Sequence, residues 1–248
     1  MILVQIQQLS TSKILIQSAA KLAVQLGKSF AVLTVAESEA GLKSLLNELK
    51  IADYQIFIKD SSKSLVEVCE AEEASFLFIQ LPDGQTNNIR RLLNDCRELR
   101  IPYLFYKDSF NPLDLTKVIL PIGFLEEELE KAQFAAAFGR FCGSEVKMLL
   151  ANDYGSKAAT NADKMKELFD KFAFRYMLDK ATKDSFKVEA ESIQVAEKEH
   201  AGIIIVSASR DYGLDDILFG PKEYHVLKKS SVPVLLVNPR GDLYALCD

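Results

Sequence analysis

The amino-acid sequence sets out one structural plan twice. An apolar run that starts at Ile2 leads into a helix-like segment closing at Gly27, and a run that starts at Val118 leads into one closing at Gly143. Both pairs are 116 residues apart (118 − 2 and 143 − 27). Later apolar runs also correspond, 74–79 with 201–206 and 102–105 with 233–236. A period this long indicates duplication of a whole domain, because solenoid repeats are much shorter.

Each half alternates apolar, strand-like runs with segments of helical period, which is typical of a parallel sheet with crossover helices. The strands are expected at 2–7, 30–35, 55–59, 76–80 and 103–107, and at 117–122, 145–151, 174–178, 203–207 and 234–237. The helices are expected at 12–26, 39–49, 64–73 and 87–99, and at 126–141, 161–172, 188–200 and 221–228. We therefore predict an α/β fold of two tandem open parallel five-stranded sheets flanked by helices, Rossmann-like, with domains 1–111 and 112–248.

Composition excludes several function classes. The 248 residues carry a formal net charge of −5, and the densest basic spots are only Arg90–Arg91 and Lys228–Lys229, whereas nucleic-acid binding needs a clustered basic surface. No apolar run approaches the ~18 residues that span a bilayer. The start of the chain has no basic segment or small-residue cleavage site of an export signal. We expect neither nucleic acid nor membrane as a partner, and a cytoplasmic location.

The sequence offers no clear catalytic or metal-binding group. The cysteines have no paired spacing, so neither a disulfide framework nor a zinc site is indicated, and three of them lie in amphipathic, core-like contexts. Both histidines fall in helices without an acid or a cysteine at ligand or catalytic spacing. We therefore expect a protein that is not an enzyme. The residues concerned are Cys69, Cys96, Cys142 and the tail residue Cys247, with His200 and His225.

Three stretches of the second half together resemble the universal stress protein family. Residues 118–122 are similar to the family's first strand, which ends in a proline-containing turn, and residues 193–206 to its third helix running into the fourth strand. Residues 213–220, followed by a helix and by 232–237, look like its phosphate loop, fourth helix and fifth strand. Residues 65–74 echo the third helix in the first half. The chain thus resembles a tandem member of this family, with its adenine nucleotide alpha hydrolase-like fold.

The resemblance implies where a ligand would bind. In an open parallel sheet, ligands lie outside the carboxyl ends of the strands where the strand order reverses, between strands one and four of each half. ATP-binding members of the family use an aspartate at the end of strand one. They also use a loop after strand four of the form Gly-x-x-Gly, nine residues, Gly, then Ser or Thr, whose glycines let the backbone approach phosphates.

This sequence departs from that pattern at most positions. The aspartate position holds Gly123 in the second half and Gln7 in the first, and the first half's loop 81–87 is too short for the motif. In the second half, proline stands at the Ser/Thr position and side chains replace the first two glycines. We therefore expect impaired nucleotide binding. The candidate pocket, as the resemblance carries it over, comprises Pro121, Ile122, Gly123, Ser207, Arg210, Gly213, Gly220 and Pro221.

Several of these features have a structural interpretation as well as a functional one. Gly213 and Gly220 either retain a working phosphate cradle, with Arg210 supplying charge, or permit a tight loop whose Pro221 suits a first helical turn. Asp215–Asp216 either holds magnesium beside a nucleotide or is solvated. The acidic run 126–128 is expected to complement a helix dipole, and Gly123 is expected to leave more room than an aspartate would.

The leading hypothesis is a non-catalytic stress-response protein that acts by binding and assembly, with no cofactor. The alternative is an ATP- or AMP-binding member, which uses the second half alone and hydrolyses ATP slowly if at all. A third reading, a regulatory module for a membrane transporter, rests on family analogy without a supporting residue. For partners we predict an internal pseudo-dimer through the fifth strands, 103–106 and 234–237, because open strand edges need pairing. A homodimer and an unidentified protein partner are also expected.

Overall fold

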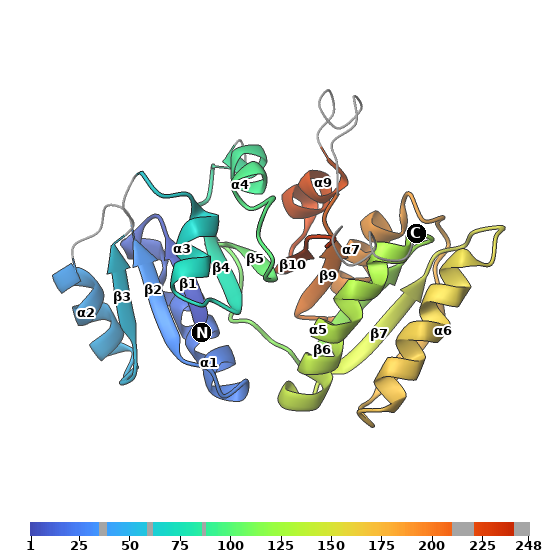
Figure 1. Cartoon of the computed structure of the whole chain (residues 1–248), viewed down its shortest axis with the longest axis horizontal. Coiled ribbons are helices and arrows are strands. Elements are labelled where there is room, and N and C mark those ends of the chain that lie inside the picture. Colours follow the sequence, from blue (N-terminus) through green and yellow to red (C-terminus); the bar gives the residue numbers. More distant parts are fainter. Residues whose placement is uncertain (35–38, 59–61, 86–87, 210–220, 241–248) are drawn as a thin grey trace. The chain divides into compact units, whose positions relative to one another are not determined.

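The computed structural model contains two compact units, Met1–Leu113 and Asp114–Asp248. It describes residues 1–34, 39–58, 62–85, 88–209 and 221–240. The predictions for Arg210, Gly213, Asp215–Asp216, Gly220 and the tail from Gly241, including Cys247, therefore lie outside the described residues. Each unit is an α/β domain, and the elements of both carry labels in Figure 1.

The first unit alternates strands and helices from its first residues onward. Its strands are β1 (Ile2–Ile6), β2 (Phe30–Thr34), β3 (Gln55–Ile58), β4 (Phe76–Leu81) and β5 (Tyr103–Lys107). Its helices are η1 (Leu9–Thr11), α1 (Lys13–Gln25), α2 (Glu39–Glu48), α3 (Leu65–Ala71) and α4 (Ile89–Asp95).

The second unit repeats the alternation. Its strands are β6 (Lys117–Ile122), β7 (Glu145–Leu150), β8 (Tyr176–Lys180), β9 (Ile203–Ser207) and β10 (Val234–Val237). Its helical elements are η3 (Glu126–Lys131), α5 (Ala132–Ala137), η4 (Phe138–Cys142), α6 (Lys157–Asp170), α7 (Val188–Glu199) and α9 (Lys222–Lys229).

Both units have the same strand order, and all the paired strands are parallel. The first runs β3-β2-β1-β4-β5 and the second β8-β7-β6-β9-β10. The central strands β1 and β9 are buried along their whole length, while β3 and β8 are largely exposed, as sheets with helices on both faces require. The predicted fold class, an open parallel sheet flanked by helices in each half, is confirmed.

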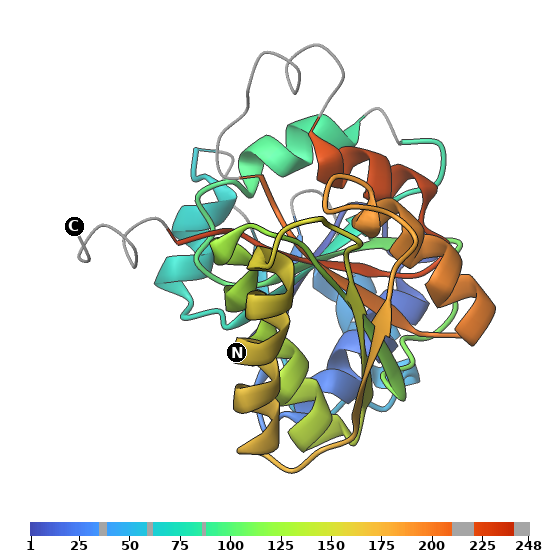
Figure 2. The ribbon, with the colours of Figure 1, turned by 90° about the vertical axis from the view of Figure 1, so that its right-hand side faces the viewer.

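Helices cover both faces of the second sheet. α5 packs on α6, and α7 packs on α9; the two pairs flank the sheet on opposite sides (Figure 2). Buried residues of α7 such as Ile193 and Ala196 recur at helical spacing, so one face of this helix forms core. This arrangement leaves the carboxyl ends of β6 and β9 accessible to loops and helix termini.

Helix ends follow local chemistry. α3 begins with a capping box, in which the Glu67 amide donates to Ser64 Oγ at 3.2 Å and the Ser64 amide donates to the Glu67 carboxylate at 2.7 Å. α7 ends at His200, which takes a left-handed conformation with φ 54°. His200 and His225 are both exposed.

The single helix predicted at 126–141 is wrong in detail. The segment is a 3-10 helix, a short α-helix and a π-helical turn in succession. Within the π-helical turn the position of Gly139 has no room for a side chain, because a Cβ there would lie 2.4 Å from the ring of Phe174. Phe174 also contacts Phe169 at a ring distance of 5.0 Å, which places it before β8 instead of within it.

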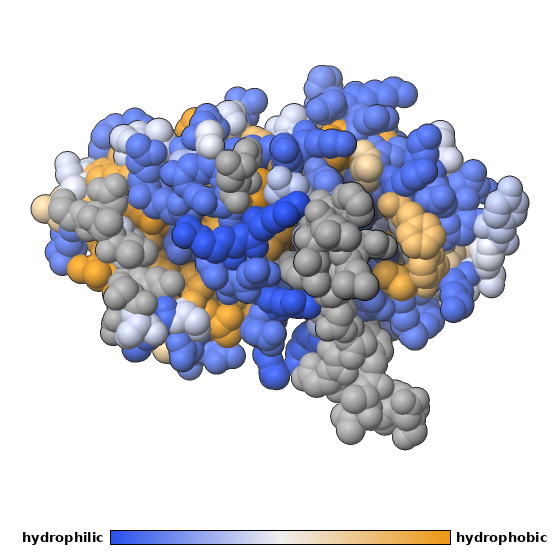
Figure 3. All heavy atoms as spheres, turned by 90° about the horizontal axis from the view of Figure 1, so that it is seen from above, coloured by the Kyte–Doolittle hydropathy of each residue, from blue (hydrophilic) through white to orange (hydrophobic). Residues whose placement is uncertain are grey.

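The surface seen from above in Figure 3 is mainly hydrophilic, with hydrophobic atoms in separate patches. Of the helices that the structure describes, none combines the length and the apolar character needed to cross a membrane. Cys69 and Cys96 are buried and Cys142 is half-buried, each as a free thiol.

Candidate functional site

The carboxyl ends of β6 and β9 form the point where the strand order of the second unit reverses. The two strands share only two registered pairs, Val118 with Ile203 and Ile119 with Ile204, whereas β6 and β7 share six. η3 contacts β9 and so lies over the place where the two central strands stop pairing. This is the position at which doubly wound sheets bind ligands.

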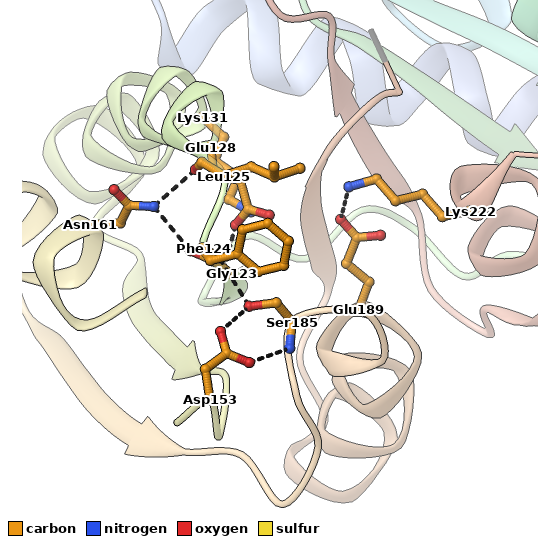
Figure 4. A network of polar contacts seen from close by, with 10 residues as sticks. All are labelled: Gly123, Phe124, Leu125, Glu128, Lys131, Asp153, Asn161, Ser185, Glu189 and Lys222. Atoms are coloured by element: carbon orange, nitrogen blue, oxygen red, sulfur yellow. Dashed lines mark hydrogen bonds and ion pairs between the residues drawn. The ribbon is translucent and has the colours of Figure 1, made fainter. Parts of the chain in front are cut away.

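Gly123 follows β6 and marks the centre of the candidate pocket. Its amide donates to Glu128 Oε2 at 2.5 Å (Figure 4). A Cβ at this position would lie 2.8 Å from Glu128 Oε1 and 3.0 Å from Ser185 Oγ. The expectation that Gly123 leaves more room than an aspartate is therefore wrong, because the carboxylate of Glu128 and the hydroxyl of Ser185 occupy the space that a side chain would take.

Two further side chains fix the backbone of this turn. Asn161 on α6 donates through Nδ2 to the carbonyls of Gly123 and Leu125 at 3.0 and 2.9 Å. Ser185 accepts from the Phe124 amide at 2.9 Å. The backbone groups that could otherwise meet a ligand at the end of β6 are thus engaged within the chain.

Ser185 is itself held in place by Asp153, which follows β7. The Ser185 amide donates to Asp153 Oδ1 at 2.9 Å, and the Ser185 hydroxyl donates to Asp153 Oδ2. This chain of bonds connects the loops after β6, β7 and β8 (Figure 4).

Glu128 and Lys131 form an ion pair inside the unit. Lys131 Nζ lies 3.2 Å from Glu128 Oε2, and their side chains are 0% and 4% exposed. A buried carboxylate is tolerated when it has both a charged partner and hydrogen bonds, and the Gly123 amide supplies the second. The expectation that the acidic run 126–128 serves only the helix dipole is incomplete, because Glu128 faces inward.

A second ion pair, between a half-exposed lysine and a buried glutamate, joins α7 to α9. Lys222 Nζ lies 3.0 Å from Glu189 Oε1, and the Glu189 side chain is 7% exposed. Burial raises the pKa of Glu189, with Lys222 opposing this shift and the nearby charge of Glu128 adding to it. The interaction with Glu128 ties this pair to the turn at Gly123 as one network of charges.

Glu223 occupies the first turn of α9, beside the segment that follows β9. Its carboxylate accepts from the Ser209 amide at 3.2 Å and from the Ser209 hydroxyl at 2.8 Å. Burial raises the pKa of Glu223, and hydrogen bonds from its own amide and from Ser209 oppose the shift. The chain therefore places its own anion at a helix N-terminus, a position that suits a negative group.

The structure places the other candidate residues as follows. Pro121 and Ile122 are buried in β6 and pair with Leu149 and Leu150 of β7. Ser207 ends β9, and its buried hydroxyl has no hydrogen-bond partner among the described residues. Pro221 is buried directly before α9 with φ −64°, consistent with its expected role in opening that helix.

Five charged side chains around the turn at Gly123 determine whether an anionic ligand could bind there. Three carboxylates face two ammonium groups, so any further anion meets an excess of acidic side chains at short range. Within the described ranges, no cluster of three or more histidine, cysteine, aspartate or glutamate residues could hold a metal ion. The residues are Glu128, Glu189, Glu223, Lys131 and Lys222.

In the first unit, one neutral side chain bonds the backbone at the corresponding reversal of strand order, between β1 and β4. Gln80, fully buried at the end of β4, accepts from the amides of Gln7 and Gln8 at 2.8 and 2.9 Å. Its amide nitrogen donates to the Gln8 carbonyl, to Thr11 and to Asp108 at 3.0, 3.0 and 2.9 Å. Gln7, at the aspartate position, donates to the Gln80 carbonyl at 3.1 Å, so it too is used internally.

Solved structures share the fold of this chain over nearly its whole length. A universal stress protein from Archaeoglobus fulgidus superposes with a TM-score of 0.69 at 11% identity, covering 97% of each chain. The chain has the universal stress protein fold. A functionally unknown protein from Pseudomonas aeruginosa PAO1 matches with a TM-score of 0.62 at 15% identity, covering 99% of this chain and 94% of the other. The resemblance noted in the sequence is confirmed at the level of the fold.

A further solved structure, a candidate universal stress protein from Pseudomonas aeruginosa UCBPP-PA14, matches with a TM-score of 0.61 at 15% identity. It covers 99% of this chain and 95% of the other, so the universal stress protein fold accounts for both units. Comparison with protein-family models and with curated protein sequences finds no match.

Sequence reasoning missed the residues that fill the candidate pocket. Asn161 and Glu189 sit in amphipathic helices, where polar residues are usually solvated. The one available signal was position, because Glu128 follows β6, a strand of the reversal point, and Ser185 follows the edge strand β8. In any sequence of this fold, residues that follow strand ends are therefore candidates for the ligand site or for groups that fill it.

Proposed function

We propose that the chain is a non-catalytic universal stress protein that acts by binding and assembly, with nucleotide binding impaired in both units. The observation that carries the proposal is the filled space at Gly123, where Glu128 Oε1 and Ser185 Oγ stand within about 3 Å of a would-be Cβ (2.8 and 3.0 Å). The excess of carboxylates around this turn adds electrostatic repulsion toward a polyphosphate. The role in stress response rests on the fold alone.

Calorimetric titration of the purified chain with ATP and magnesium tests this proposal. We expect no saturable heat, and no nucleotide in mass spectra of the purified protein. Saturable heat near one site per chain would overturn the proposal and favour the alternative, an ATP- or AMP-binding protein that uses the second unit.

A matched pair of glycine variants would then locate the site. In the alternative, Gly220→Val weakens ATP binding because Gly220 matches the last glycine of the family's phosphate loop. Gly155→Val is the control: Gly155 has no atom within 4 Å of a would-be Cβ and no left-handed backbone, so this variant leaves affinity unchanged. Equal weakening by both variants would argue against a phosphate loop at Gly220.

The assembly part of the proposal has its own test. The pairing of the fifth strands, a homodimer, a protein partner and a cytoplasmic location stay predictions. Light scattering coupled to size exclusion measures the mass of the particle, which we expect to be a multiple of 27.7 kDa. A particle of 27.7 kDa at all concentrations would contradict the homodimer and leave the internal pseudo-dimer to be tested by cross-linking.

A further inference from the structure

A hollow lies between α7 and α9 on the surface of the second unit. Its volume of about 310 Å³ falls at the lower end of the range for small-molecule sites. It shares Glu189 and Lys222 with the charge network at Gly123 and extends away from that network along the two helices. The lining used below comprises Phe186, Glu189, Ile193, Lys222, His225 and Lys229.

One wall of the hollow is apolar. Phe186, in the loop before α7, is 83% exposed, which is unusual for so large an apolar side chain. Its ring contacts the ring of Phe124 edge-to-face at a centroid distance of 5.5 Å, and this contact fixes its position beside the hollow. Ile193 and Val226 line the hollow from below and are buried. The wall therefore offers apolar area that a compact ligand could remove from water.

Basic side chains of α9 also line the hollow. Lys222, His225 and Lys229 follow one another at spacings of three and four residues, so they share one face of α9. Lys222 is neutralised by Glu189 at 3.0 Å. Lys229 is exposed and has no ion pair among the described residues. The rim next to the apolar wall thus keeps an unneutralised ammonium group and an exposed imidazole.

We propose that this hollow binds a small organic anion in which a compact aromatic or aliphatic body carries one acidic group. The apolar body covers Phe186, and the acidic group faces Lys229 and His225. A ligand with several negative charges is disfavoured, because the carboxylate of Glu189 lines the same hollow. The proposal goes beyond the proposed function and is independent of whether the chain binds nucleotide.

A pair of fluorescent probes tests the charge requirement. 8-Anilinonaphthalene-1-sulfonate carries an aromatic body and one sulfonate, and N-phenyl-1-naphthylamine carries a similar body without the charge. Fluorescence titration of the full chain should give saturable binding of the sulfonate at one site. The uncharged probe should bind about fivefold more weakly, as expected for one exposed charge contact.

Matched variants assign binding to the hollow. Lys229→Glu should weaken sulfonate binding about fivefold or more, whereas Lys228→Glu, the same charge reversal on the neighbouring residue outside the hollow, should change it less than about twofold. Phe186→Ala should weaken both probes about fivefold through lost apolar contact. Phe141→Ala is its control, since Phe141 is 52% exposed and lines a different hollow. Thermal unfolding of each variant checks that it is folded.

Three results would overturn the proposal. The first is the absence of saturable sulfonate binding to the parent chain. The second is equal weakening by Lys229→Glu and Lys228→Glu, which would indicate general attraction to the basic end of α9. The third is equal affinity for the charged and uncharged probes, which would leave a purely apolar surface.

Discussion

The two units share one fold but use different side chains to hydrogen-bond the backbone where the strand order reverses. In the first unit one neutral side chain, Gln80, makes three hydrogen bonds to the backbone after β1, accepting from the amides of Gln7 and Gln8 and donating to the Gln8 carbonyl. In the second unit the backbone after β6 is satisfied by Glu128, Asn161 and Ser185, which come from three different segments. The sheet is retained in both, while the polar groups at the strand ends are satisfied independently. Backbone groups buried at a reversal point have to be paired, and this chain shows two ways of pairing them with its own side chains.

The largest effect is expected where the second unit depends on charge. Glu128→Gln leaves the buried ammonium of Lys131 without its partner, so it should lower the free energy of unfolding by about 3 kcal/mol. Hydrogen exchange in urea, read by mass spectrometry on peptides of each unit, measures the loss where it occurs. Glu126→Gln is the control, because its ion pair with Lys164 at 3.4 Å is exposed and should contribute less than about 1 kcal/mol. Equal losses in the two variants would show that the buried pair does not support the second unit.

A smaller effect is expected for the neutral closure of the first unit. Gln80→Leu orphans the amides of Gln7 and Gln8 and should cost about 2 kcal/mol. The same exchange experiment should confine the loss to peptides of residues 1–113. Gln17→Leu, an exposed position on α1, serves as the control and should change stability by less than about 0.5 kcal/mol. If Gln80→Leu lowers the free energy of unfolding no more than the control does, the hydrogen bonds of Gln80 do not stabilise the first unit.

Gly123 tests whether the second unit's pocket is filled. Gly123→Ala forces a methyl group against Glu128 and Ser185 and should cost about 1 to 2 kcal/mol by overpacking. Gly155→Ala, with open space around it, should be close to neutral. Urea unfolding followed by circular dichroism compares the two. A neutral Gly123→Ala would indicate an empty pocket and would revive the expectation that this glycine makes room for a ligand.

The smallest effect concerns pH. Because burial raises the pKa of Glu223 above its usual 4.5, the folded state holds this proton more tightly than the unfolded state does. The stabilisation is complete below pH 4.5 and is lost as the pH rises through the folded pKa. Glu223→Gln should therefore make the stability of the second unit fall less steeply above pH 4.5, measured by urea midpoints across a pH series. A steeper slope in Glu223→Gln than in the parent chain would reverse the sign of the account.

The sequence alone predicts most of the sheet and little of the site. Runs such as Ile203–Val206 indicate buried parallel strands because strands covered on both faces are near-continuously apolar and rich in β-branched residues. The start of β8 and the breaks within 126–142 could not be predicted from local pattern, which does not reveal tertiary contacts such as that of Phe174 with Gly139. The filling of the pocket was equally hidden. Glu128 and Ser185 have unremarkable local sequences, and only the fold brings them to Gly123.

Amide hydrogen exchange at Gly123 and Phe124, resolved by NMR with and without excess magnesium and ATP, tests the central claim most directly. The account predicts that both amides are protected in the chain alone, because they donate to Glu128 and Ser185, and that ATP leaves their exchange unchanged. Fast exchange in the chain alone that slows when ATP is added would contradict it. The amides after β6 would then be unpaired in the free chain and protected only by the bound nucleotide.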